Sequence, residues 1–138
     1  MAAAAFSFTV ETRGFCDIHD ITPQVREGLC EVDIDDGLVC VSVPGSTAAV
    51  STIEHEDGAL RDLQDAIERL APQDRAYAHD ARWGDGNGFA HVRAALLGPS
   101  ITVPRVGGRL QLGTWQQIIL LDFDNRPRSR DVAVQIAG

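Results

Sequence analysis

Alternation of apolar and polar residues at both ends of the chain is the feature that most constrains its fold. Phe6, Phe8 and Val10 alternate with polar residues near the start. Residues 132–136 show the same pattern near the end. A repeat of two residues is typical of a β-strand with one buried face. Both ends of the chain are therefore predicted to form strands, with any helices between them.

The segment between these strands carries one clear helix pattern and several further strand patterns. Apolar residues of the segment 58–70 fall on one stripe at helical spacing, and Pro72 ends the pattern. Thr22-Pro23 indicates another helix start, with Thr22 as N-cap, and Asn87 is the expected cap of a helix over 88–97. Further strands are predicted over residues 38–43, 48–53, 101–103, 109–112 and 118–123, with a hairpin turn at Gly107-Gly108. The pattern predicts an α+β fold with a mixed or antiparallel, β-sandwich-like core and two to three helices.

Length, charge and composition exclude several classes of protein. A chain of 138 residues predicts one domain over residues 1–138, large enough to bury its own hydrophobic core. The formal net charge of -8 argues against nucleic-acid binding, because that function needs a basic face. No apolar run approaches ~18 residues, so no membrane-spanning segment is expected. All 12 basic side chains are arginine, which excludes any mechanism that uses a lysine.

The cysteines and the first residues bear on the cellular location. Cys16, Cys30 and Cys40 lie far apart in the sequence and form no C-x-x-C motif. This arrangement is typical of reduced, mostly buried thiols in a cytosolic protein. The segment 1–5 lacks the basic region of a signal peptide. We therefore expect the protein to be cytoplasmic.

Two histidines and a glutamate are candidate metal-site residues. His79 and His91 lie on either side of the glycine-rich segment 84–88. If their imidazoles converge, they suit zinc or another borderline metal, with a carboxylate or water completing the ligands. The alternative is two structural histidines bonded to the backbone. Glu54 is predicted at the end of a strand, where its side chain can point into a cleft.

Arginines and the glycine-rich segment are candidates for binding a phosphorylated ligand. Residues 84–88 either present backbone N–H groups to an anion at a helix start or form a plain tight turn. Arg93, Arg126 and Arg128 are the expected phosphate partners. The alternative for exposed arginines in an acidic protein is simple surface balance.

Trp115 and Gln116 are candidate ligand-binding residues at the start of a predicted strand. An indole beside amide side chains suits a flat heterocycle. The indole can stack on the ring of the ligand, and the amides can hydrogen-bond to its polar edge. The alternative is a tryptophan buried in the core or at a subunit interface.

Several short motifs, taken together and in order, resemble the YjbQ-like family, whose members are often called secondary thiamine-phosphate synthases. The resemblance runs from about Ile21 to Gly138. The matching residues are Ser46-Thr47-Ala48, Glu54, Tyr77, His79, Asn87, Ala90-His91, Leu96-Leu97-Gly98, Ile101 to Pro104, Leu112-Gly113-Thr114-Trp115-Gln116 and Arg126-Pro127-Arg128-Ser129-Arg130.

The resemblance implies a compact α+β homotrimer with a site between subunits. It implies a divalent metal, zinc or magnesium, held by His79 and His91 with Glu54 nearby. The implied weak activity joins a hydroxymethylpyrimidine diphosphate to a thiazole phosphate and releases pyrophosphate. Gly45 and Phe89 stand where relatives often carry histidine, which removes two potential ligands.

The roles expected for the other site residues follow from that reaction. Glu54, Arg93, Arg126 and Arg128 are the candidate catalytic residues, and Ser46, Thr47, Asn87, Trp115 and Gln116 are the candidate substrate-binding residues. The partner is then a small, phosphorylated molecule. The alternative is a non-enzymatic homotrimer that binds a metal or a small anion.

Overall fold

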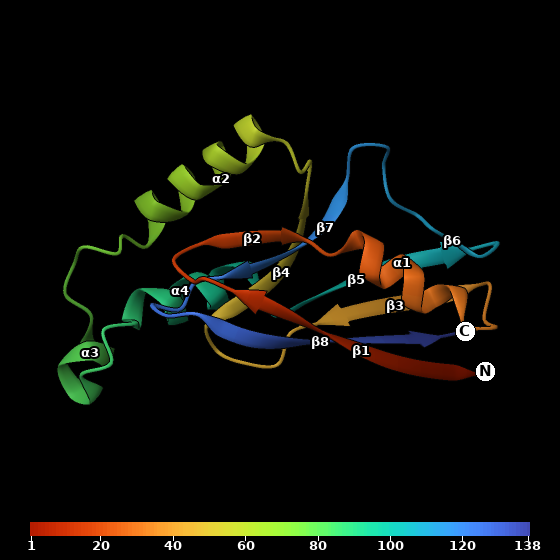
Figure 1. Cartoon of the computed structure of the whole chain (residues 1–138), viewed down its shortest axis with the longest axis horizontal. Helices are drawn as coiled ribbons and strands as arrows, with labels where there is room; N and C mark the ends of the chain where they lie inside the picture. Colours follow the sequence, from red (N-terminus) through yellow and green to blue (C-terminus); the bar gives the residue numbers. More distant parts are fainter.

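The computed structural model describes all residues 1–138, which form two antiparallel sheets and four helices (Figure 1). The larger sheet has the strand order β1-β8-β3-β5-β6 and the smaller has the order β2-β7-β4. The larger sheet contains β1 (Ala3–Thr12), β3 (Gly37–Ser42), β5 (Ser100–Val106), β6 (Arg109–Leu110) and β8 (Arg128–Ala137). The smaller contains β2 (Asp17–Asp20), β4 (Ala48–Ile53) and β7 (Gln117–Asp122). The predicted α+β class with a sandwich-like core is confirmed.

The two ends of the chain pair with each other along their whole length. Strand β1 runs antiparallel to β8, from Ala3 opposite Ala137 to Thr12 opposite Arg128. On β8 the alternate residues Val132, Val134 and Ile136 are buried, and the residues between them are exposed. The alternation seen in the sequence is thus the buried and exposed faces of one strand pair.

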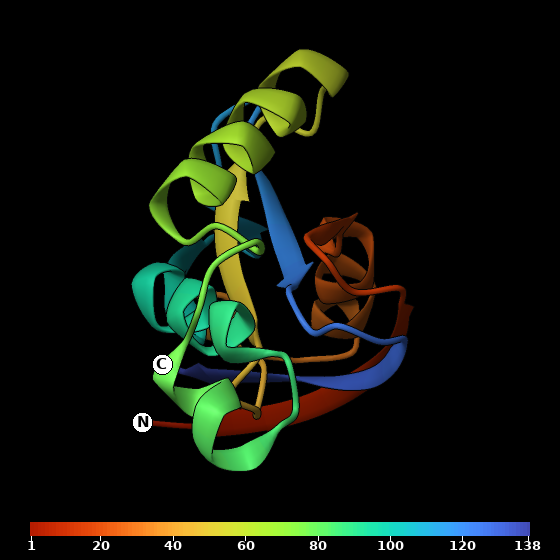
Figure 2. The same ribbon diagram turned by 90° about the vertical axis from the view of Figure 1, so that its left-hand side faces the viewer.

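The smaller sheet is covered on both faces. One face of β7 carries Ile118 and Leu120, which pack with the larger sheet and with α1 (Thr22–Cys30). The other face carries Ile119 and Leu121, which pack under α2 (Asp57–Leu70) and α4 (Gly88–Leu97). Figure 2 shows α2 and α4 on one side of β4 and β7, and α1 on the other. Burial of both faces explains why residues 118–121 form an uninterrupted apolar run instead of alternating.

Most predicted helices and strands are confirmed. The structure corrects the predictions mainly at the ends of these elements. The strand at 48–53 and the helix at 88–97 have the predicted bounds. Thr22 is the first residue of α1, not its N-cap, and its hydroxyl accepts a bond from the Ile118 N–H at 2.8 Å. Asn87 occupies the N-cap position of α4, but its side chain makes no capping bond. The hairpin turn at Gly107-Gly108 is confirmed by their positive φ angles, and the strand that follows it ends at Leu110.

Two short elements were not predicted. They are β2 and the six-residue helix α3 (Ala78–Trp83). None of the four helices combines the length and the apolar character that crossing a lipid bilayer requires.

Candidate functional site

A buried ion pair joins the two sheets at the end of β7. Asp122, the last residue of β7, is 0% exposed, and Arg130 of β8 is 4% exposed. Arg130 Nε donates to Asp122 Oδ2 at 2.6 Å, and Arg130 Nη2 donates to Oδ1 at 3.0 Å. Thr12 also donates to Oδ2, at 2.5 Å. Two parallel bonds between a guanidinium and a carboxylate fix both the direction and the distance of the pair.

A second carboxylate, Asp124, connects this ion pair to α4 and to the surface. Its Oδ1 accepts from Asn87 Nδ2 at 3.2 Å, and its Oδ2 accepts from Arg128 Nη1 at 3.0 Å. Thr47, which precedes β4, donates to Asp124 at 3.2 Å and accepts from Arg130 Nη2 at 2.7 Å. Residues from five separate segments therefore form one continuous polar network.

Both carboxylates of the network are held in the charged form. Burial raises the pKa of Asp122, but hydrogen bonds from Arg130, Thr12 and the Asp124 N–H outweigh it, so the pKa lies below its ordinary value. Burial also raises the pKa of Asp124. Hydrogen bonds, led by the one from Asn87, again outweigh the burial and lower the net pKa.

The two histidines lie next to this network with their rings together. The ring centroids of His79 on α3 and His91 on α4 are 4.3 Å apart, with an angle of 39° between the planes. The expectation that the two imidazoles converge is confirmed. No other side chain makes a hydrogen bond to the His91 ring, whereas His79 Nδ1 lies 3.4 Å from Asp80 Oδ1.

A tight reversal of the chain brings the two rings together. Gly84 ends α3 in the left-handed conformation, with a φ of 74°. Gly88 begins α4, and a Cβ there would lie 2.5 Å from the Cβ of Tyr77, so only glycine permits this approach. Asp80 Oδ1 accepts the Gly88 N–H at 2.8 Å. The sequence offered this helix start as a possible anion-binding position. In the structure the Asp80 carboxylate of the same chain occupies it.

One chain supplies two clustered ligands for a metal, not three. No group of three or more His, Cys, Asp or Glu side chains is arranged to hold a metal ion. Glu54 follows the last residue of β4, whereas Thr47 of the polar network precedes the first. A strand rises ~3.3 Å per residue, so about 20 Å of sheet separates Glu54 from the network. Within a single chain Glu54 and the histidines lie at opposite ends of the smaller sheet.

Trp115 and Gln116 lie at the same end as Glu54. Ile53 pairs with Gln117, which places the loop before β7 beside the end of β4. Gln116 donates to Thr52 Oγ1 at 3.1 Å and accepts the Gly113 N–H at 3.0 Å. Trp115 is 69% exposed, so it is not a core residue of this chain. The predicted site residues therefore form two groups, one at each end of β4.

The three predicted phosphate partners have different surroundings. Arg126 is exposed in the turn between β7 and β8, and Arg128 is half-buried against Asp124. Arg93 is 2% exposed: its Nε donates to the Ala71 carbonyl, its Nη2 bonds to Glu68, and the guanidinium lies over Phe89. Ser46 is exposed beside Gly45.

Sequence reasoning missed the carboxylates of the polar network. Asp122 and Asp124 interrupt and follow an apolar run that was assigned to a strand. An aspartate inside a buried strand needs a hydrogen-bonded partner, because burying an isolated charge is very costly. That argument, applied to residues 118–124, would have singled out both carboxylates and pointed to a basic partner such as Arg130.

The molecule is thus an α+β protein of two packed antiparallel sheets, with a histidine pair and a buried carboxylate–arginine network at one end. Residues 6–138 match the model of the UPF0047 protein YjbQ-like family. The chain belongs to this family.

Relatives and solved structures agree with this assignment. A UPF0047 protein of Archaeoglobus fulgidus is 44% identical over 127 residues, which cover 92% of this chain and 96% of the relative. A UPF0047 protein of Mycobacterium tuberculosis is 46% identical over 114 residues, covering 81% of this chain and 84% of the relative.

Solved structures share the whole fold. A hypothetical protein from Aeropyrum pernix superposes with a TM-score of 0.90 at 36% identity, covering 98% of both chains. A YbjQ-like protein of unknown function from Sulfolobus solfataricus has a TM-score of 0.89 at 29% identity and covers 99% of both chains.

Proposed function

We propose that this protein is a metal-dependent transferase that acts on a small, phosphorylated substrate, with His79 and His91 as metal ligands. The observation that carries the proposal is the 4.3 Å separation of the two ring centroids. Two imidazoles of a small protein that face each other at a partly exposed position, one of them without a hydrogen-bond partner, form half of a typical zinc site.

The donor set of one chain fits a divalent metal in part. Imidazole nitrogen is a good ligand for zinc and similar metals. Asp80 lies beside His79 Nδ1 and would orient that ring, as carboxylates often do for metal-bound histidines. Since no third ligand joins the pair, the remaining positions fall to the substrate, to water or to another copy of the chain.

The chemistry proposed is displacement of diphosphate from an activated carbon. When bound, the metal would stabilise negative charge on the leaving diphosphate. Arg126, in the turn before β8, and Arg128, the first residue of β8, would bind the phosphate oxygens. Asp124 holds Arg128 in place, and Asn87 bonds to the same carboxylate from the start of α4.

The specific reaction that we propose is weak thiamine-phosphate synthase-like coupling of a pyrimidine diphosphate to a thiazole phosphate. Ser46, Thr47 and Asn87 would contact substrate at the histidine end. Trp115 and Gln116 would frame the pyrimidine, and Glu54 would join the site, from a neighbouring copy in a cytoplasmic homotrimer. Arg93 would act indirectly, because its contacts hold α4 against the segment after α2.

The test compares metal content and turnover in three proteins. Wild type, the double variant H79A/H91A and the control H55A are loaded with zinc and dialysed. His55 is exposed near the start of α2, away from the pair. We expect wild type and H55A to keep zinc and form thiamine phosphate, and H79A/H91A to lose both. Zinc retained by H79A/H91A at the wild-type level would refute the metal site.

One observation favours a second candidate function, a non-enzymatic homotrimer that binds a metal or anion. Within one chain the predicted residues lie at opposite ends of β4, so no complete catalytic group is assembled. This alternative predicts that wild type keeps its zinc yet forms no thiamine phosphate from the two substrates. Measured turnover that depends on His91 would exclude it.

A further inference from the structure

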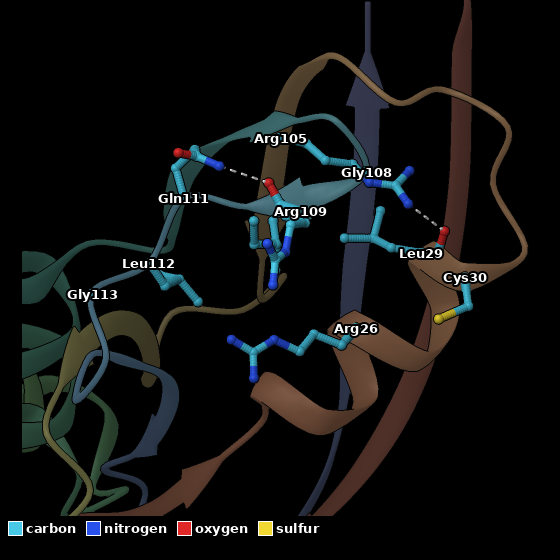
Figure 3. A pocket seen from close by; sticks show the side chains of 10 residues that line it. Arg26, Leu29, Cys30, Arg105, Gly108, Arg109, Gln111, Leu112 and Gly113 are labelled. Atoms are coloured by element: carbon cyan, nitrogen blue, oxygen red, sulfur yellow. Dashed lines mark hydrogen bonds between the residues drawn. The ribbon is translucent and has the colours of Figure 1, made fainter.

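A cavity far from the histidine pair lies between α1 and the β5–β6 hairpin. Its volume is about 890 Å³, and the loop after β6 completes its wall (Figure 3). Strands β3 and β5 pair with Gly37 opposite Arg105 at this end and Ser42 opposite Ser100 at the other. The chain leaves β3 at Ser42 and reaches Thr47 of the polar network. The cavity and the network are therefore at opposite ends of this strand pair.

Three arginines line the cavity: Arg26 from α1, Arg105 from β5 and Arg109 from β6. None of them takes part in an ion pair in this chain. Nearby Asp36 accepts the Gly107 N–H at 2.8 Å. Its carboxylate thus helps to hold the hairpin turn. Three guanidinium groups without an ion-pair partner around one cavity of an acidic protein favour a local positive potential, with the Asp35 carboxylate beside Gly108 as the nearest negative charge that the wall shows.

Arg105 connects the two walls of the cavity. It is 6% exposed, and its guanidinium donates to the carbonyls of Leu29, Val32 and Ile34 at 3.0, 3.2 and 2.7 Å. These bonds fix the end of α1 against the hairpin. Arg105 Nε is buried without any hydrogen-bond partner. An unsatisfied, buried donor on a cation is costly, so an anionic ligand nearby would relieve part of that cost.

Arg26 and Arg109 are free to bind a ligand. Figure 3 shows their side chains projecting into the same space from opposite walls of the cavity. Both are exposed, and neither guanidinium makes a hydrogen bond within the chain. Two guanidinium groups on opposite sides match the charge of one phosphate dianion, which each can bind through two parallel bonds.

The rest of the wall combines apolar side chains with Gln111, Gly108 and Gly113. Leu29, Leu110 and Leu112 line the cavity together with Cys30. A volume of about 890 Å³ is in the range of small-molecule sites, which are mostly apolar and carry a few polar groups that orient the ligand. The cavity can thus take an organic body as well as an anionic group.

We propose that this cavity is a second ligand site, which binds a phosphate monoester with its phosphate between Arg26 and Arg109. The leucines contact the organic part of the ligand. The site lies apart from the histidine pair of the same chain.

The test is calorimetric titration with phenyl phosphate, a monoester with a flat apolar body. The variant R26Q/R109Q removes both free cations, and R61Q is the matched control, because Arg61 is an exposed arginine on α2 without an ion pair. Arg105 is left intact because it holds α1. We expect saturable binding to wild type and R61Q, and at least ten-fold weaker binding to R26Q/R109Q.

Further ligands and one further variant make the outcome decisive. Inorganic phosphate lacks the apolar body, and benzoate lacks the dianion, so both should bind more weakly than phenyl phosphate. H91A should bind phenyl phosphate as wild type does. Unaltered binding by R26Q/R109Q, loss of binding in H91A, tighter binding of benzoate, or no saturable binding to wild type would each overturn the proposal.

Discussion

Replacing Arg130 by methionine tests the buried network most directly. The substitution R130M keeps an unbranched side chain of moderate volume but removes the only cation that contacts Asp122. Asp122 is 0% exposed. It accepts three hydrogen bonds from other side chains, two from Arg130 and one from Thr12. Removing one partner of a buried ion pair costs about 3–5 kcal/mol, because the other charge stays buried without compensation. That loss is a large part of the ~5–15 kcal/mol that stabilises a typical domain.

The stability difference between wild type and R130M is expected to depend on pH. In wild type the pKa of Asp122 lies below its ordinary value of 3.8, so its contribution to stability is present above that pH and is lost as the pH falls further. Without Arg130, burial dominates and the folded-state pKa of Asp122 rises above the unfolded value. The penalty in R130M is then greatest at neutral pH and decreases as the pH falls through the raised pKa, because the carboxyl becomes protonated.

The assay is urea unfolding, followed by tryptophan fluorescence and circular dichroism at pH 7 and pH 5. The gap in unfolding free energy between wild type and R130M should narrow at pH 5. R130K, which keeps the charge but loses the two parallel bonds, should be destabilised less at pH 7. The double variant D122N/R130M should recover part of the loss. A gap for R130M below about 1 kcal/mol at pH 7, the range of an exposed ion pair, would refute the reasoning, as would a gap that widens at pH 5.

Three further predictions concern separate parts of the chain. G45A should lower the melting temperature, because Gly45 has a φ of 137° and an added Cβ would lie 3.2 Å from Arg130 Nη1; an unchanged melting curve would contradict this. Burial raises the pKa of Cys16 to about 11, so iodoacetamide at pH 8 should label exposed Cys30 first, with Cys16 labelled only in urea, as mass spectrometry of peptides would show. E56A should lower stability at neutral pH, because the Glu56 carboxylate caps α2. Hydrogen bonds from the Gly58 and Ala59 N–H groups lower its pKa below 4.5, so the difference from wild type should shrink as the pH falls below that value, and thermal melts at pH 7 and pH 3 would check it.

The sequence predicted those elements that bury a periodic face. Strands β1 and β8 and the helix over residues 57–70 each expose one side and bury the other, so that their apolar residues recur at strand or helix spacing. Strand β2 and helix α3 carry no such pattern. Strand β2 exists because residues 17–20 pair with residues 119–122 of β7, a contact that no local window contains.

The histidine pair was predictable, and the network beside it was not predicted. His79 and His91 are close in sequence and separated by glycines, so convergence is a local property of the chain. The contacts of Arg130 depend on the assembled sheets, because Thr47 lies 83 positions from it in the sequence. Only the presence of aspartates at the end of an apolar run signalled that a buried cation was required.

The location of Glu54 decides how a complete site would form. Strand β4 separates Glu54 and Trp115 from the histidines, so a shared site requires opposite ends of two copies to meet. Each such contact joins the Glu54 end of one copy to the histidine end of another. A ring of three copies makes this contact three times, and an antiparallel pair makes it twice. Sedimentation velocity of wild type and of E54A/W115A would test this arrangement. A monomer with full zinc binding and turnover would show that one chain is sufficient, and Glu54 would then have no part in the site.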